Sequence, residues 1–251
     1  MAFELAHPDP RYSRVHLIEP APLGYLHLAA DVQAPHRPGP VLRRSRSKHQ
    51  LVGVLKWQAR QLVQLDTVER ATVYDALAFA PPGGYVKDRP APLPPAWFDV
   101  VVLVETASPE AVGDVRAASP YQALVEALTE QARRVHHVAA RNVRRVGDVD
   151  KSCPGLFLFN YFVGDDPGQA VELWDYLAGW YEAETGLDNS TLLVPLEGEK
   201  SDYVVINHAR WDHSLPVFMA RQLPKKTFRG YMLANLAAHH LAAMPVLYRL
   251  A

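Results

Sequence analysis

The chain contains very little cysteine: Cys153 is the only one among its 251 residues. A single thiol excludes an intramolecular disulfide framework and a cysteine-rich zinc site, and it fits a reducing compartment. No segment reaches the ~18 consecutive apolar residues that a membrane-spanning helix needs. Residues 1–24 carry prolines and charges where a secretory signal needs an apolar run. We therefore expect a soluble, cytoplasmic protein with no membrane partner.

The sequence also lacks a charge excess and the common cofactor motifs. Its formal net charge of −1 argues against a nucleic-acid-binding surface. Two adjacent histidine pairs are present, but residues 136–137 in a strand point to opposite faces, and residues 239–240 on a helix lie about 100° apart. No H-E-x-x-H, P-loop or G-x-G-x-x-G pattern occurs. We predict no nucleic-acid partner, no metal ion and no cofactor.

Hydrophobic residues make up 49% of the chain and charged residues 21%, enough to fill a core. After an irregular leader at residues 1–23, strand-like and helix-like segments follow the order β-α-β-β-α-β twice, in units at 24–147 and 155–251. The proline-rich stretch at residues 80–96 is interpreted as an insertion, with a lid over a pocket as the alternative. The predicted strands cover residues 24–30, 70–79, 97–105, 134–146, 156–163, 190–196, 202–211 and 244–250.

The two halves follow one plan. A shift of 103 residues places Asp99 on Asp202, Val104 on Asn207 and Glu105 on His208. The order β-α-β-β-α-β is typical of a ferredoxin-like unit, whose sheet has one apolar face to cover. We predict an α+β protein in which two such units cover each other and close a barrel with the helices outside. Two unrelated α+β units are the alternative.

Two stretches resemble a known family. They are VVLVETASPEAV followed by SPYQAL, and YVVINHARWD followed by a proline-broken helix. Both are similar to the dimeric α/β-barrel superfamily, and nearest to its antibiotic biosynthesis monooxygenase-like branch. The resemblance implies a fused pair that does in one polypeptide what other members do as homodimers. It also implies a small, often aromatic ligand between sheet and helices. Some members oxygenate or cyclise polyketide-like substrates without metal, and others bind or degrade haem.

The candidate site lies on the first and third strands of the second half. We expect these strands to be central and parallel, which brings Asn160 near Asn207. Polar groups among apolar strands each cost ~1–3 kcal/mol unless they find hydrogen-bond partners. The two asparagines are therefore either a satisfied core pair or the groups that orient a ligand oxygen. In the second case we predict an aromatic-walled cavity, with walls from Tyr161, Trp174, Tyr181 and Trp211.

His208 is the candidate general acid or base, because its pKa is ordinarily near neutral. Strand alternation puts it on the face opposite Asn207, unless a bulge intervenes. We predict an enzyme that acts on a hydrophobic or aromatic metabolite by cofactor-independent oxygenation or general acid/base chemistry. A non-catalytic ligand-binding or stress-associated barrel protein is the alternative, and association of copies of the chain stays open.

Haem is the second alternative for the ligand. Asn160 and Trp211 resemble two of the three residues that the family's haem degraders use. The third is a histidine on the following helix, and it is missing where expected. His213 comes too early in the chain, and residues 239–240 come too late. This departure weakens the haem interpretation.

Overall fold

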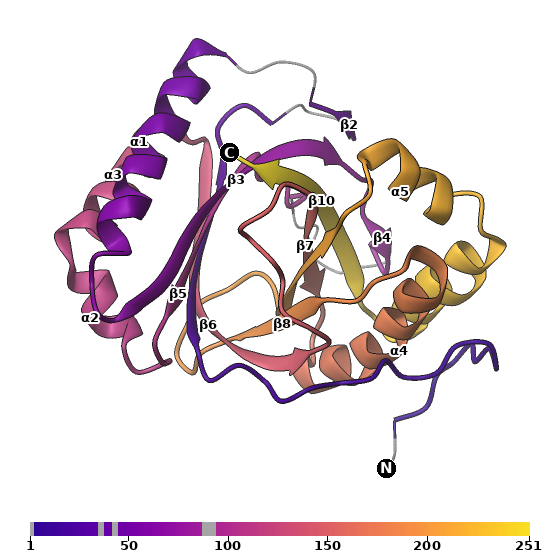
Figure 1. The fold of residues 1–251 in the computed structure, drawn as a ribbon. Coiled ribbons are helices and arrows are strands. Elements are labelled where there is room, and N and C mark those ends of the chain that lie inside the picture. Colours follow the sequence, from indigo (N-terminus) through magenta and orange to yellow (C-terminus); the bar gives the residue numbers. More distant parts are fainter. Residues whose placement is uncertain (1–2, 35–37, 42–44, 87–93) are drawn as a thin grey trace.

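The chain forms a closed β-barrel between two layers of helices in a computed structural model (Figure 1). The structure describes residues 3–34, 38–41, 45–86 and 94–251. The first half of the chain supplies the helix layer on one side of the barrel, and the second half supplies the layer on the other side. This arrangement confirms the prediction of an α+β barrel with its helices outside.

The first half begins with a strand, a helix and two further strands. Ser45 caps helix α1 by accepting a hydrogen bond from the Lys48 backbone N–H, and Pro120 lies in the first turn of α3. The elements are β1 (Gly24–Asp31), β2 (Gly39–Pro40), α1 (Arg46–Leu62), β3 (Val68–Phe79), β4 (Gly83–Gly84), β5 (Val100–Thr106), α2 (Val112–Ala117), α3 (Ser119–Gln131) and β6 (Arg134–Arg145).

The second half repeats the order with a longer first helix and a broken last one. Asp166 caps α4, and Gly186 ends it in a left-handed conformation that suits glycine. Pro224 separates α5 from a π-helical turn, η1. The elements are β7 (Leu156–Val163), α4 (Pro167–Thr185), β8 (Ser190–Pro195), β9 (Val205–Trp211), α5 (Leu215–Gln222), η1 (Phe228–Leu233), α6 (Ala234–Ala238) and β10 (Ala242–Leu250).

Eight strands close the barrel in the order β3-β5-β1-β6-β8-β9-β7-β10, and β10 pairs back with β3. All of these pairings are antiparallel. The central strands are β1 and β5 in one half and β7 and β9 in the other, as predicted. Their expected parallel direction is wrong. The crossover helix returns the second strand parallel to the first, and the following turn reverses the third strand.

Apolar side chains form one core inside the barrel and one under each helix layer. The barrel core is rich in aromatic rings, among them Tyr74, Phe98, Phe157 and Phe159. Leu26, Val102 and Leu124 belong to the core beneath α1 and α3. The third core lies beneath the second helix layer, where Leu158 and Leu177 contribute. The central strands β1, β5, β7 and β9 are therefore buried on both faces.

The N-terminal segment, residues 3–23, runs along the second half before β1 begins (Figure 1). Its Val15 N–H donates to the Asp175 carbonyl in α4, and Ile18 forms an isolated bridge with Arg145. Within the residues that the structure describes, none of the helices is both long and apolar enough to cross a membrane.

Candidate functional site

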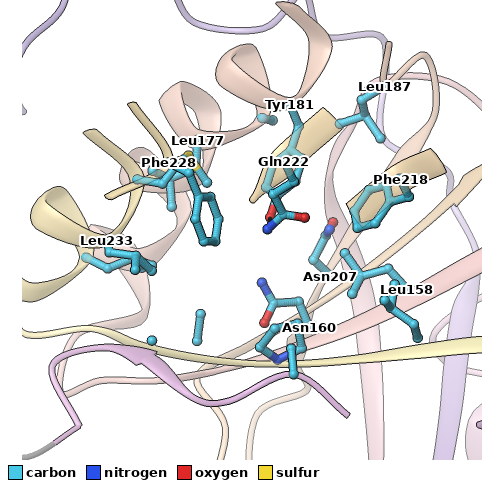
Figure 2. A pocket seen from close by; sticks show the side chains of 18 of the residues that line it. Leu158, Asn160, Leu177, Tyr181, Leu187, Asn207, Phe218, Gln222, Phe228 and Leu233 are labelled. Carbon is cyan, nitrogen blue, oxygen red and sulfur yellow. Dashed lines mark hydrogen bonds between the residues drawn. The ribbon is translucent and has the colours of Figure 1, made fainter. Parts of the chain in front are cut away.

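A cavity of about 170 Å³ lies between the outer face of the second-half sheet and its helices. The strands β7, β9 and β10 form its floor, and α4, α5, η1 and α6 form its roof (Figure 2). Leu223, which is 52% exposed, lies at its rim and shows that the cavity reaches the surface. An apolar cavity of about 150 Å³ is enough to hold benzene. The space therefore suits a small molecule of one or two rings.

Asn160 and Asn207 face each other across the floor of this cavity (Figure 2). They are direct partners in the register of β7 and β9. Asn207 Oδ1 accepts a hydrogen bond of 2.6 Å from the Ser190 hydroxyl, which leaves its Nδ2 group to donate elsewhere. Asn160 Oδ1 is buried and has no hydrogen-bond partner within the described residues. The pair thus offers amide N–H donors and one unpaired acceptor to a ligand.

Two further polar side chains come from the roof. Gln222 in α5 donates a hydrogen bond of 3.2 Å from Nε2 to the Tyr181 hydroxyl. Its Oε1 remains an acceptor, and the Tyr181 hydroxyl can still donate. Burial raises the pKa of Tyr181, so this hydroxyl stays neutral. The described lining contains no lysine, arginine, histidine, aspartate or glutamate, so its polar groups are all uncharged.

Aromatic rings wall the cavity. Trp174, Tyr181 and Trp211 line it, where the sequence prediction put them. The Trp211 indole N–H donates to the Thr185 hydroxyl at 3.1 Å, and its ring centroid lies 4.6 Å from that of Phe218. The hydrogen bond fixes the indole plane and leaves its faces for apolar contact.

Two residues predicted for the site point elsewhere. Tyr161 and His208 project into the barrel interior, on the face of their strands opposite the asparagines. Neither strand has a bulge here: Phe159 pairs with His208 and Asn160 with Asn207 in uninterrupted register. Strict alternation therefore takes both rings away from the cavity, and the roles expected for them at the ligand do not fit their positions.

The environment of His208 holds it neutral. Its Nε2 lies 3.0 Å from the Tyr74 hydroxyl, and its Nδ1 lies 3.0 Å from the Leu158 carbonyl. The ring stacks on Phe159 with a centroid distance of 4.2 Å. Burial lowers the pKa of His208 well below its usual value, and repulsion from Lys151 lowers it further. These contacts are those of a structural histidine in an aromatic core.

Sequence reasoning missed part of the lining. Gln222 lies in a segment read only as part of a proline-broken helix, although it faces the same side of α5 as the buried Phe218. The segment Ala80–Gly83 also lines the cavity, although it follows a strand of the other half. The proline-rich stretch is therefore part of a cavity wall at residues 80–83; residues 87–93 of that stretch lie outside the described residues.

The N-terminal segment holds the roof in place. The Tyr12 hydroxyl is hydrogen-bonded to Glu184 in α4 and to Thr227, directly before η1. The Trp180 indole N–H donates to the same Thr227 hydroxyl at 3.1 Å. Tyr12 thus ties the two helical segments that carry much of the roof.

Comparison with known proteins identifies the fold. No protein-family model matches the sequence, and no curated protein matches it. An anthrone oxidase-like protein of known structure superimposes with a TM-score of 0.57 at 11% identity, covering 90% of each chain. A protein assigned as a monooxygenase from Fusobacterium nucleatum subsp. nucleatum gives 0.51 at 7% identity, covering 93% of this chain and 95% of that one. The fold is a dimeric α/β barrel.

A more distant likeness is to a mutant chlorite dismutase from Candidatus Nitrospira defluvii, with a TM-score of 0.47 at 10% identity and 92% of each chain covered. The cavity does not fit haem, which was the second alternative. The described lining offers no lysine or arginine to pair with the carboxylates of haem, and no histidine or cysteine to bind its iron. Tyr181 also lines the cavity, but burial raises its pKa, and its hydroxyl accepts a hydrogen bond from Gln222, which does not suit an iron-bound phenolate. No group of three or more His, Cys, Asp or Glu side chains in the described part of the chain is arranged to hold a metal ion.

Proposed function

We propose that this dimeric α/β barrel is an enzyme that binds an uncharged, oxygen-bearing aromatic molecule in the second-half cavity and oxidises it with O₂. The observation that carries the proposal is the facing amide pair in an otherwise apolar, aromatic-walled space. A buried acceptor without a partner costs ~1–3 kcal/mol. A ligand hydroxyl that donates to Asn160 Oδ1 removes that cost.

The polar groups define what the ligand offers in return. Asn207 Nδ2 donates to a keto or hydroxyl oxygen, and Asn160 Oδ1 accepts from a hydroxyl. A carboxylate or an ammonium ion is disfavoured, because the described lining has no opposite charge to compensate its desolvation. Trp174 and Trp211 pack against the rings of the ligand.

The reaction is a monooxygenation. A methylene carbon activated by the aromatic system gives up two hydrogens; one atom of O₂ becomes its keto oxygen, and the other leaves as water with both hydrogens. Negative charge that develops on the existing ligand oxygen during proton loss is stabilised by the Asn207 amide N–H. The likeness of the fold to an anthrone oxidase-like protein and to a protein assigned as a monooxygenase supports this choice.

Ligand binding without turnover is the second candidate function. The observation that favours it is that the described lining has no ionisable group with an ordinary pKa near neutrality, so proton removal would depend on the acidity of the ligand itself. Consumption of O₂ distinguishes the two candidates.

We also propose that the two halves are tandem copies of one ferredoxin-like unit, so that the chain is an intramolecular pseudo-dimer. Each half has the same strand order, with its first and third strands in the middle and its second and fourth at the edges. The shift of 103 residues aligns Val104 with Asn207, and both residues lie on the outer face of the third strand, beneath the helix layer of their own half.

The test measures the affinities of 2-naphthol, naphthalene and 2-naphthoate for the wild type and for the variants Asn160→Leu and Asn207→Val. Binding is detected by the quenching of tryptophan fluorescence. We expect the wild type to prefer 2-naphthol to 2-naphthoate. Each substitution should lower the affinity for 2-naphthol by about 10-fold, equivalent to roughly 1.4 kcal/mol, and leave the affinity for naphthalene nearly unchanged. O₂ uptake with 1-indanone and related ketones then tests turnover.

Gln61→Leu is the control, since it exchanges an exposed amide for leucine far from the cavity. It should bind all three probes like the wild type. Equal loss of 2-naphthol and naphthalene in the asparagine variants, with reduced thermal stability, would show that the pair is a structural core feature and not a ligand site.

A further inference from the structure

One wall of the cavity, next to β10, comes from the first half of the chain. Residues 80–83 follow β3 in the first half, yet they line the second-half cavity together with Asn160. They are fastened at several points. The Ala80 N–H donates to the Pro245 carbonyl at 3.3 Å, and the Tyr85 N–H donates to the Leu241 carbonyl at 2.8 Å.

Strand β4 continues this attachment. Gly83 pairs with Ala243 and Gly84 with Ala242, so the segment adds to β10 as a short edge strand. The Tyr85 ring packs on His240 with a centroid distance of 4.7 Å. Two consecutive prolines, Pro81 and Pro82, have fixed φ angles and make the segment stiff. The segment is therefore a rigid wall that is held by the second-half sheet.

The two glycines of this wall have different surroundings. Gly84 has a φ of 82°, and a Cβ there would lie 2.4 Å from the Leu241 carbonyl oxygen, so the backbone itself requires glycine. A Cβ on Gly83 would instead lie 2.6 Å from Cδ2 of Leu233, the end of a flexible side chain. Leu233 belongs to η1 and lines the cavity. A methyl group on Gly83 therefore displaces a side chain and not the backbone.

We propose that Gly83 and Leu233 together set the size of ring system that the cavity accepts. Gly83 provides the space that lets Leu233 stand back from the ligand, and the first half of the chain thereby determines the selectivity of a site in the second half. The ligand class is that of the proposed function, on which this inference rests: an uncharged aromatic molecule with an oxygen substituent. A larger residue at position 83 narrows the acceptable class from two rings to one.

The experiment compares the affinities of phenol and 2-naphthol for the wild type, Gly83→Ala, Leu233→Ala and the double variant. Gly83→Ala should weaken 2-naphthol by at least about 10-fold relative to phenol, the discrimination that one methyl group achieves in an apolar pocket. Leu233→Ala should raise the affinity for 2-naphthol relative to that for phenol. The double variant should recover most of the 2-naphthol affinity that Gly83→Ala loses.

Gly53→Ala is the matched control, since Gly53 lies in α1 with no atom within 4 Å of an added Cβ. It should leave both affinities unchanged. An unchanged phenol-to-2-naphthol ratio in both Gly83→Ala and Leu233→Ala overturns the inference while the proposed function stands. If Gly83→Ala does not fold, the ratio in Leu233→Ala decides alone. A wild type that binds neither probe overturns the proposed function and this inference with it.

Discussion

The central strand pairs of the two halves occupy corresponding places but carry different chemistry. In the first half, Leu26 lies opposite Val104 in the pairing of β1 and β5. In the second half, Asn160 lies opposite Asn207 in the pairing of β7 and β9. Leu26 and Val104 are fully buried in the apolar core beneath α1 and α3. The same strand pairing therefore occurs with an apolar pair in a filled core and with a polar pair on a cavity floor.

The helix layers differ in the same direction. In the first half, α1 and α3 are regular helices that pack side by side (Figure 1). In the second half, a proline and a π-helical turn interrupt the layer between α5 and α6. π-Helical turns are often found at functional sites because they redirect side chains without ending the helix. The interrupted layer leaves space where a continuous helix would pack onto the sheet.

A buried ion cluster distinguishes the first half further. Lys48 lies 2.8 Å from Asp99 and 3.0 Å from Asp75, and all three side chains are almost fully buried. The position that corresponds to Asp99 under the shift of 103 residues is Asp202, which is exposed. Removing one partner of a buried ion cluster is strongly destabilising. The first half is thus held together by a buried ion cluster, whereas the second half has the exposed Asp202 at the corresponding position and contains the cavity.

The largest effect is expected when the polar floor is transferred to the first half. Leu26→Asn removes a fully buried leucine and introduces an amide with no partner. The lost burial and the unpaired amide should together lower the free energy of unfolding by about 4 kcal/mol. Urea denaturation followed by circular dichroism measures the change.

The reverse exchange provides the control. Asn160→Leu removes an unpaired buried acceptor and should leave the free energy of unfolding unchanged or raise it by about 1 kcal/mol. If both substitutions destabilise the protein equally, then the asparagines contribute to the fold as much as the leucine does, and the contrast between the halves is lost.

A second, smaller effect concerns the barrel interior, which both halves share. His27, His136 and His208 are buried there, and burial lowers the pKa of each; the pKa of His136 falls to about 4. Below the ordinary value of ~6.5, the unfolded chain binds protons that the folded chain excludes, so stability falls as the pH falls. From pH 7.5 to 5.5, the free energy of unfolding should decrease by about 1 kcal/mol for each histidine.

Removal of one ring tests this assignment. His27→Phe keeps an aromatic ring among Phe159 and Tyr161 and removes one titrating group. The decrease in the free energy of unfolding from pH 7.5 to 5.5 should become smaller by about one third of the part due to the three histidines. Denaturation at both pH values measures this change. A wild-type stability that is constant between these pH values contradicts the prediction.

Patterns along the chain were sufficient to predict much of the fold. The apolar run that contains β5 and the proline-marked helix starts identified the elements, and the double β-α-β-β-α-β order led to the closed barrel. The direction of β9 relative to β7 was predicted wrongly, although the predicted order β-α-β-β implies it: the crossover helix makes the second strand parallel to the first, and the turn after it reverses the third. The start of that strand was also placed three residues early, at residue 202, whereas β9 begins at Val205.

The candidate site was only partly predictable. Alternation along β9 separates Asn207 from His208, and this local rule held. Which of the two faces the helices depends on how the sheet closes, and that follows from pairings between β3 and β10 and between β6 and β8 that are distant in sequence. The contribution of residues 80–83 depends on the same closure. Contacts between the halves therefore decided what the sequence left open.

The smallest effect is expected at the contact between the N-terminal segment and the second helix layer. It tests whether this contact stabilises only that layer or the first layer as well. Tyr12→Phe removes the hydroxyl that is hydrogen-bonded to Glu184 and Thr227, and it should lower the free energy of unfolding by about 1 kcal/mol. Hydrogen exchange should become faster in η1 and remain unchanged in α1, because the segment ties only the second helix layer. Tyr231→Phe is the matched control: its buried hydroxyl has no hydrogen-bond partner within the described residues, so its loss should cost nothing. Equal acceleration in α1 and η1 would mean that the tie stabilises the barrel as a whole, and the two layers would then not be independent.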